Sequence, residues 1–124
     1  MHLGRSARRL AYLVSLVLPL MLTVACSGGG GGGGGAITVR MTEFKFEPAT
    51  FTATAGQPVR LNLQNEGTVV HDFMIKDLNV HSPKVQPGKS MPFEFTPARA
   101  GTFEIMCEEP GHEPGGMKGT ITVQ

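Results

Sequence analysis

Apolar and polar side chains alternate with a period of two along much of the chain after residue 36, which is the pattern of β-strands that bury one face. The segments 37–42, 59–64 and 90–95 show this alternation most clearly, whereas helical spacing is absent. Gly and Pro residues separate the segments, as at Gly56-Gln57-Pro58 and Pro87-Gly88. About seven or eight short strands in fewer than ninety residues predict an all-β fold, an antiparallel β-sandwich with Greek-key connections.

The first 26 residues differ in composition from the rest of the chain. Three arginines precede an apolar run from Leu10 to Ala25, which is the order of charge and hydrophobicity found in an export signal. Ser15 and Pro19 interrupt this run, and it is short for a stable membrane span. The leader therefore predicts that the domain lies outside the cytoplasm, in the periplasm or on the outer face of the cell membrane.

The leader ends in Leu22-Thr23-Val24-Ala25-Cys26, which resembles a bacterial lipobox. In a lipobox the leader is cleaved and the cysteine, here Cys26, becomes a lipid-bearing N-terminus. Thr23 departs from the leucine usually found at its position, whereas the small Ala25 and the following Ser27 fit the pattern. We expect a lipid anchor on Cys26; the alternatives are a simple secretory signal cut near Ala25 or an uncleaved anchor.

Residues 27–35 form a Gly-rich tether, with eight consecutive glycines from Gly28 to Gly35. Such a segment cannot form a packed core, and as a flexible linker it would reach on the order of 16 Å. A domain held in this way would stay near the membrane, so its partners should be membrane-associated or should diffuse along the membrane surface. The alternative is a low-complexity spacer without functional consequence. Residues 36–124 remain as one domain.

The charge of this domain excludes one class of partner. Residues 36–124 contain eight Lys and Arg against ten Asp and Glu, a formal charge of −2 with His neutral. A mildly acidic domain has no electrostatic footprint for nucleic acid.

If Cys26 carries a lipid, Cys107 has no cysteine to pair with in an oxidising compartment, and metal ligation would explain an unpaired thiol there.

Metal-ligand side chains cluster near the C-terminus. Four residues separate Cys107 from His112, and four separate His112 from Met117, in a segment rich in Gly and Pro that is able to curl around an ion. His71 lies 36 positions before Cys107. Each residue alone is weak evidence, because lone Cys, His and Met residues usually pack in cores. Together, a thiolate, two imidazoles and a weak thioether suit one copper ion that cycles between Cu(I) and Cu(II).

Two segments resemble those of a known family. The ligand loop reads Phe103-Glu104-Ile105-Met106-Cys107, then Pro110-Gly111-His112, then Gly116-Met117-Lys118-Gly119-Thr120, and the stretch Asn65 to Phe73 looks like a first-histidine segment. Both resemble the cupredoxins, the type 1 blue copper proteins, with spacings closer to those of auracyanin and rusticyanin than to plastocyanin. The resemblance covers about residues 36–124. It implies a cupredoxin-like Greek-key sandwich in which His71, Cys107 and His112 bind copper strongly and Met117 binds it weakly along the axis.

The alternation also predicts where the ligands lie. A strand from Val69 to Ile75 would direct Val69, His71 and Phe73 inward, and the strand ending at Cys107 would bring that thiol to the same end of the sandwich.

Family members often carry Asn after the first His, whereas this chain has Asp72. If Asp72 is ionised near the metal, its charge should lower the reduction potential. His81 is expected in a solvated surface connection.

The resemblance implies a carrier of single electrons rather than an enzyme, with the exposed edge of His112 as the electron route. The carboxylates of Glu108, Glu109 and Glu113 should favour a basic partner such as a c-type cytochrome; a membrane oxidoreductase is the other expected partner, and the protein should be a monomer. The alternative function is a copper-binding or copper-delivery lipoprotein. An enzyme with a further copper centre would need more histidines than the three in residues 36–124.

Overall fold

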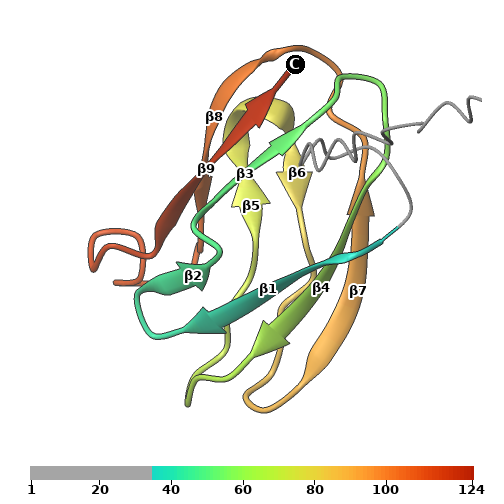
Figure 1. Ribbon diagram of the computed structural model, residues 1–124. Coiled ribbons are helices and arrows are strands. Elements are labelled where there is room, and N and C mark those ends of the chain that lie inside the picture. Colours follow the sequence, from blue (N-terminus) through green and yellow to red (C-terminus); the bar gives the residue numbers. More distant parts are fainter. Residues whose placement is uncertain (1–34) are drawn as a thin grey trace, which may run out of the picture.

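The computed structural model of the protein describes residues 35–124 as a two-layer β-sandwich (Figure 1). The predicted signal, the lipobox-like end at Cys26 and nearly all of the tether lie outside the described residues. One sheet has the strand order β2-β1-β4-β7 and the other has the order β3-β9-β8-β5-β6. The strands are β1 (Ile37–Thr42), β2 (Lys45–Glu47), β3 (Thr50–Ala53), β4 (Val59–Asn65), β5 (Met74–Ile75), β6 (Val80–His81), β7 (Ser90–Phe95), β8 (Gly101–Met106) and β9 (Lys118–Val123).

The β-sandwich prediction is confirmed, although the pairing and the strand count differ in detail. The described residues contain nine strands, because β5 and β6 are separate two-residue strands on either side of a 3₁₀ turn, η1 (Lys76–Leu78). Two pairs are parallel rather than antiparallel: β1 with β4, where Val39 faces Leu63, and β3 with β9, where Phe51 faces Ile121. Parallel neighbours arise here because the chain crosses from one sheet to the other between them.

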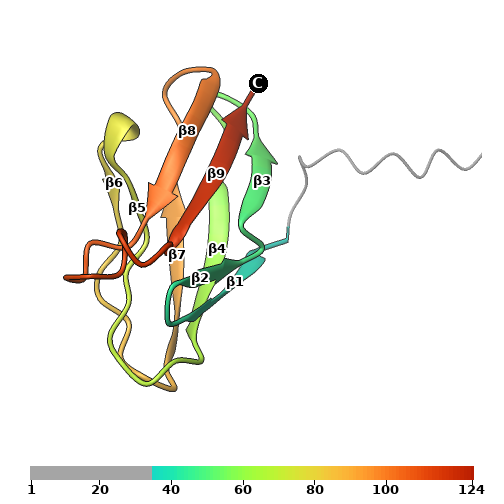
Figure 2. The same ribbon diagram turned by 90° about the vertical axis from the view of Figure 1, so that its left-hand side faces the viewer.

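The core lies between the two sheets, which Figure 2 shows facing each other. The predicted period of two is followed closely in β1, β4 and β8, where every second side chain is buried. Phe73 lies at the centre of an aromatic cluster, with its ring 6.0–6.2 Å from four other rings, those of Phe46, Phe51, Phe93 and Phe95. Burying these apolar faces is the main source of stability for such a small domain.

The predicted strand from Val69 to Ile75 is wrong over most of its length. Only Met74 and Ile75 form a strand, and His71 makes an isolated antiparallel bridge with Val85. Val69 is exposed, whereas His71, Asp72 and Phe73 are all fully buried, so the segment has no alternating faces. The alternation fails because side chains from elsewhere bind the backbone of this segment in place of a neighbouring strand.

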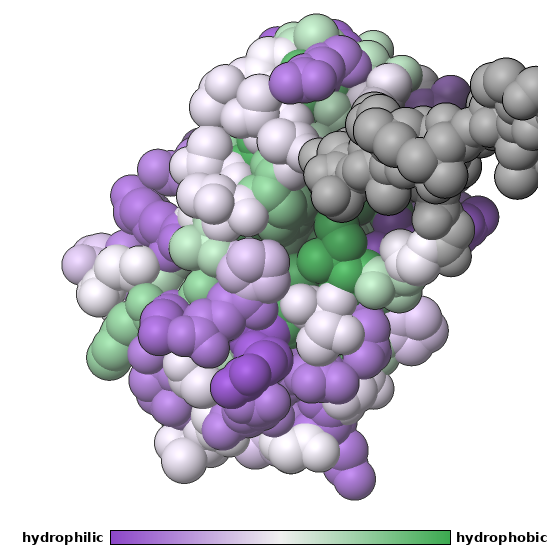
Figure 3. All heavy atoms as spheres, in the orientation of Figure 1, coloured by the Kyte–Doolittle hydropathy of each residue, from purple (hydrophilic) through white to green (hydrophobic). Residues whose placement is uncertain are grey.

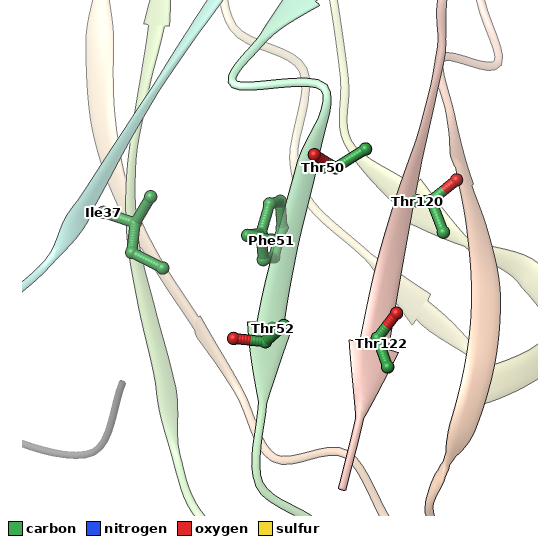
Figure 4. A pocket seen from close by; sticks show the side chains of 6 residues that line it. All are labelled: Ile37, Thr50, Phe51, Thr52, Thr120 and Thr122. Carbon is green, nitrogen blue, oxygen red and sulfur yellow. The ribbon is translucent and has the colours of Figure 1, made fainter. Parts of the chain in front are cut away.

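Two other features bear on function. No helix within residues 35–124 is long and apolar enough to cross a membrane. A shallow pocket lies beside the start of β1, where Figure 3 shows apolar side chains on the surface; Figure 4 shows Ile37, Phe51 and four threonines lining it. Because none of these lining side chains is ionisable, the pocket has no metal-ligand or acid–base chemistry of its own.

Candidate metal centre

Three of the four predicted ligands meet at the end of β8. The Cys107 Sγ atom lies 3.4 Å from Nδ1 of His112 and 4.0 Å from Nδ1 of His71, and the two Nδ1 atoms are 3.2 Å apart. One ligand atom from each residue therefore lies within 4.8 Å of the other two. This spacing lets one ion contact all three atoms, because metal–nitrogen and metal–sulfur bonds are about 2.0–2.3 Å long.

Met117 closes the loop that carries Cys107 and His112, and it is fully buried. Its backbone N–H donates a hydrogen bond to the carbonyl of His112 (2.9 Å), so the two residues are fixed relative to each other. The loop leaves the sandwich after β8 and returns as β9 (Figures 1 and 2). A buried thioether at this position fits the weak axial ligand expected from the sequence.

His71 is oriented for ligation. Its Nδ1 atom faces Cys107 and His112, whereas its Nε2 atom is buried and has no hydrogen-bond partner among the described residues. The nearest carboxylate atom, Oε1 of Glu43, is 4.0 Å from Nε2. Burial, followed by the proximity of His112, lowers the pKa of His71 below its ordinary value. The neutral imidazole, which is the form that binds metals, is therefore favoured.

Cys107 is the only cysteine that residues 35–124 contain, and it is fully buried and unpaired. Burial raises the pKa of its thiol to about 11. Without a metal the sulfur therefore keeps its proton and is a poor nucleophile at neutral pH. A metal has to displace that proton, so binding at this thiol releases a proton and favours a thiophilic ion.

The segment before His71 is held by side chains from other parts of the chain. The carboxylate of Glu43 accepts hydrogen bonds from the N–H groups of Thr68 (2.5 Å) and Val69 (3.2 Å) and from the Thr68 hydroxyl (3.0 Å). The buried Asn65 side chain accepts from the Gly67 N–H (2.9 Å) and donates to the carbonyls of Val69 and Val85, both at 2.8 Å. The backbone at Gly67, Thr68 and Val69 is thus ordered without a continuous sheet partner.

The loop after Cys107 is held mainly by its own backbone. Its N–H to carbonyl bonds include His112 to Glu109 (3.0 Å) and Gly115 to Gly111 (3.0 Å). Gly111 adopts φ +86°, a left-handed conformation that other residues rarely adopt. One side chain ties the loop to the first segment: Oδ1 of Asp72 accepts a hydrogen bond from the Glu108 N–H at 2.8 Å.

The family model for the cupredoxin-like domain matches residues 15–123. The chain belongs to this family. Its sequence is 26% identical over 137 residues to the copper-resistant cuproprotein CopI of Pseudomonas aeruginosa, covering 72% of this chain and 76% of that protein. Among solved structures it resembles auracyanin from Roseiflexus castenholzii (TM-score 0.66, 24% identity, 75% of this chain and 99% of auracyanin) and auracyanin A from Chloroflexus aurantiacus (TM-score 0.60, 22% identity, 73% and 100%). These structural likenesses show the shared fold.

The donor set of this cupredoxin fits copper by the chemistry of its atoms. Two imidazole nitrogens and one thiol sulfur converge, and the remaining candidate is a thioether, a combination of soft and intermediate ligands that suits copper in both common oxidation states. A zinc site of the structural kind would more commonly present further thiolates or imidazoles in place of the thioether.

Sequence reasoning missed the side chains that position the ligands. Glu43 carries no motif signal, because its role depends on a contact across 25 positions of the chain. Asn65 begins the stretch that resembles a first-histidine segment, but the sequence did not show its hydrogen bond to the carbonyl of Val85, 20 positions away. His81 was expected in a solvated loop, and this expectation is wrong in part. It is exposed, but it lies in β6 with Nε2 at 3.0 Å from Glu108 and 3.5 Å from Asp72.

Two of the three loop carboxylates are paired with lysines within this cupredoxin, and the third contacts an imidazole. Glu108 contacts His81, Glu109 contacts Lys84, and Glu113 contacts Lys118 (3.0 Å). The exposed loop therefore carries less unpaired negative charge than its sequence suggests.

Proposed function

We propose that this cupredoxin carries single electrons on one copper ion, which Nδ1 of His71, Sγ of Cys107 and Nδ1 of His112 would hold, with the Met117 thioether as a weak fourth ligand. The observation that carries the proposal is the convergence of three buried or partly buried donor atoms within 4.8 Å at one end of a rigid sandwich. Copper, when bound, supplies a one-electron redox couple. The family is the second support.

The side chains themselves have two tasks in this function. The first is to keep the donor atoms in nearly the same places in both oxidation states, which lowers the reorganisation that accompanies each electron. Hydrogen bonds from Glu43 and Asn65 hold the His71 segment, and internal turns hold the loop. The second task is to exclude water, and full burial of Cys107 and Met117 accomplishes it. No proton transfer or bond cleavage is assigned to any side chain, so the proposed protein is a carrier and not an enzyme.

Reconstitution with copper tests the metal centre. The wild-type protein should bind one Cu(II) per chain and show an intense visible thiolate-to-copper absorption band that disappears on reduction and returns on oxidation. Cys107→Ser should abolish the band while the far-ultraviolet circular dichroism stays unchanged. Met106→Leu, which removes a sulfur next to Cys107 that we do not assign as a ligand, should keep it. A colourless wild-type protein, or a Cys107→Ser variant that keeps the band, would refute the proposal.

We further propose that electrons enter and leave through the ring of His112. This residue is partly exposed, whereas His71 and Cys107 are fully buried, and the exposed Phe44 packs edge-on against it with centroids 5.8 Å apart. The proposed partner is a c-type cytochrome or a membrane oxidoreductase. It would dock over this ring with a surface rich in Lys and Arg. Electron-transfer rates with such a partner should then fall as ionic strength rises, only modestly because two of the loop acids are paired with lysines. Electron-transfer rates that do not change with salt would contradict the proposed attraction between the acidic loop and a basic partner.

A second candidate function is copper binding for resistance or delivery. The similarity to copper-resistant cuproproteins from Pseudomonas aeruginosa and Rubrivivax gelatinosus supports it. The two functions differ in how firmly copper is held. An electron carrier should keep its copper through repeated redox cycles in the presence of a competing Cu(I) chelator, whereas a delivery protein should release it on reduction.

We also propose a location outside the cytoplasm, attachment through a lipid on Cys26 and a monomeric state. The leader composition and the lipobox-like end support the first two. Fractionation of cells that express the full chain tests them: Cys26→Ser should move the protein from the membrane fraction to the soluble one. Light scattering of the released domain tests the monomer.

A further inference from the structure

A second cluster of metal-ligand side chains lies next to the proposed copper centre. His81 Nε2 is 3.0 Å from Oε2 of Glu108 and 3.5 Å from Oδ2 of Asp72, and one ligand atom from each of the three residues lies within 4.8 Å of the other two. The cluster combines one imidazole nitrogen with carboxylate oxygens from two separate residues. His81 and Glu108 are exposed, so an ion has access from solvent.

The buried member of the cluster, Asp72, makes one short hydrogen bond and one long contact. Asp72 is fully buried, and its Oδ1 atom accepts the hydrogen bond from the Glu108 N–H at 2.8 Å. Its Oδ2 atom points toward the His81 ring, whose Nε2 lies at 3.5 Å, beyond the ordinary 2.7–3.2 Å range for such a bond. A buried carboxylate oxygen needs a close positive or hydrogen-bonding partner. The recorded partner of Oδ2 is the exposed His81 ring, and an ion held between the two would bring a positive charge to this buried oxygen.

We propose that Asp72, His81 and Glu108 form a second site, for a divalent transition-metal ion. An imidazole together with two carboxylates suits Zn²⁺ or Cu²⁺, with water in the remaining position, whereas Mg²⁺ prefers oxygen ligands alone. Lys84 is the cation facing this region, and its ammonium group is paired with Glu109, so it leaves the two cluster carboxylates available. The ligands come from three separate segments, which the fold brings together.

The second site is linked to the copper centre through the backbone. Asp72 directly follows His71, and Glu108 directly follows Cys107, so two of its ligands are chain neighbours of two copper ligands. A dication held there places positive charge beside the redox centre, which favours Cu(I) over Cu(II) and raises the reduction potential. Linkage requires the reverse as well: reduction of the copper should tighten the binding of the second ion. This part of the inference rests on the proposed function, whereas the existence of the site does not.

Titration with Zn²⁺, which is redox-inert and colourless, tests the site. The probe is added to the copper-loaded protein near neutral pH, after the copper content has been measured, and binding is followed by calorimetry and by metal analysis after dialysis. We expect one Zn²⁺ per chain with no loss of copper. His81→Gln should weaken binding at least about tenfold. Glu104→Gln, which removes an exposed carboxylate from β8 outside the cluster, should leave the affinity unchanged. An excess of Mg²⁺ should not compete.

Each outcome decides one part of the inference. Absence of Zn²⁺ binding to the wild-type protein, or equal affinity in His81→Gln, would overturn the site. If Zn²⁺ binds through His81 but leaves the copper potential unchanged, the site stands and the linkage fails. If copper does not bind, the proposed function fails, and comparison of Cys107→Ser with Cys107→Ser/His81→Gln still tests the second cluster by itself.

Discussion

The two segments that carry the proposed metal ligands are ordered in opposite ways. The segment from Glu66 to Phe73 is fixed from outside: side chains of Glu43 and Asn65 bind its backbone, His71 exchanges backbone hydrogen bonds with Val85, and the Phe73 N–H donates to the hydroxyl of Ser82 at 2.9 Å. The loop from Cys107 to Met117 is fixed chiefly from within, by short turns of its own backbone.

This difference predicts which substitutions affect the stability of the domain and which affect only the metal centre. The first segment shares its anchors with the sandwich, so a change there should unfold the domain more easily as well as disturb the site. The loop shares few anchors, so a change there should alter the metal centre at little cost to the fold. The effects of substitutions in the two segments should therefore differ in kind.

The largest loss of stability is expected for Asn65→Ala. The substitution removes three hydrogen bonds and leaves the Gly67 N–H and the carbonyls of Val69 and Val85 without that partner. The free energy of unfolding should fall by about 2–4 kcal/mol. Denaturant titration of the metal-free protein measures it. Asn62→Ala, on the same strand but without a side-chain hydrogen bond inside residues 35–124, should change it by less than about 0.5 kcal/mol. Equal losses would show that the first segment does not depend on Asn65.

Gly111→Ala should have a smaller effect on stability and a specific effect on the site. A Cβ at this position has open space, so the cost comes only from the left-handed φ of +86° and should be about 1 kcal/mol. The control is Gly88→Ala, which carries a similar φ of +70° in a turn outside both ligand segments. Both variants should lose similar stability, but only Gly111→Ala should shift the visible copper spectrum. A spectral shift in both would mean that the loop is not an independent unit.

Glu43→Gln should weaken the protein in a pH-dependent way. Hydrogen bonds from Thr68, the largest of the causes, lower the pKa of Glu43 from 4.5 to about 2. Because the folded-state pKa lies below the unfolded one, the carboxylate stabilises the fold fully above about pH 4.5, and this contribution is lost as the pH falls toward 2. Wild type should therefore exceed Glu43→Gln in stability at pH 6, and the gap should close in acid. Glu94→Gln is the exposed control. A gap that does not vary with pH would show that the ionised form of Glu43 has no special role.

Of the four substitutions, Asp72→Asn should change the stability of the domain least. Its specific effect should be on the reduction potential. An amide oxygen can still accept the hydrogen bond from the Glu108 N–H, so this contact between the two segments survives. Loss of the carboxylate charge beside the copper ligands should raise the reduction potential on the order of tens of millivolts. Cyclic voltammetry of the zinc-free protein measures this. A potential that falls or stays constant would remove the electrostatic role of Asp72.

Sequence predicted the features of this molecule that depend on local pattern. Alternation found the buried faces of β1, β4 and β8. The spacing from Cys107 to Met117 predicted a ligand loop, and in the structure this segment is one connected turn region. His71 was singled out because its surrounding residues resemble a first-histidine segment, and the structure places its ring against the other two donors.

The features that sequence did not predict depend on contacts between distant positions. The segment from Val69 to Ile75 alternates like a strand, yet hydrogen bonds from Glu43 and Asn65 override that pattern and leave Val69 exposed. The partnership of His81 with Glu108 joins positions that lie far apart in the chain, through the pairing of β6 with β5 and of β5 with β8. Such long-range side-chain contacts have no periodic signature.

The direction of β1 places the N-terminal end of the described domain and the His112 ring far apart. The described chain enters the sandwich at Ile37, and β1 then runs for about 20 Å before the turn that places Phe44 against the His112 ring. An attachment through the residues before Gly35 would therefore join β1 at the end away from this ring. Such an attachment would leave the end of the domain that carries the His112 ring accessible to a second protein.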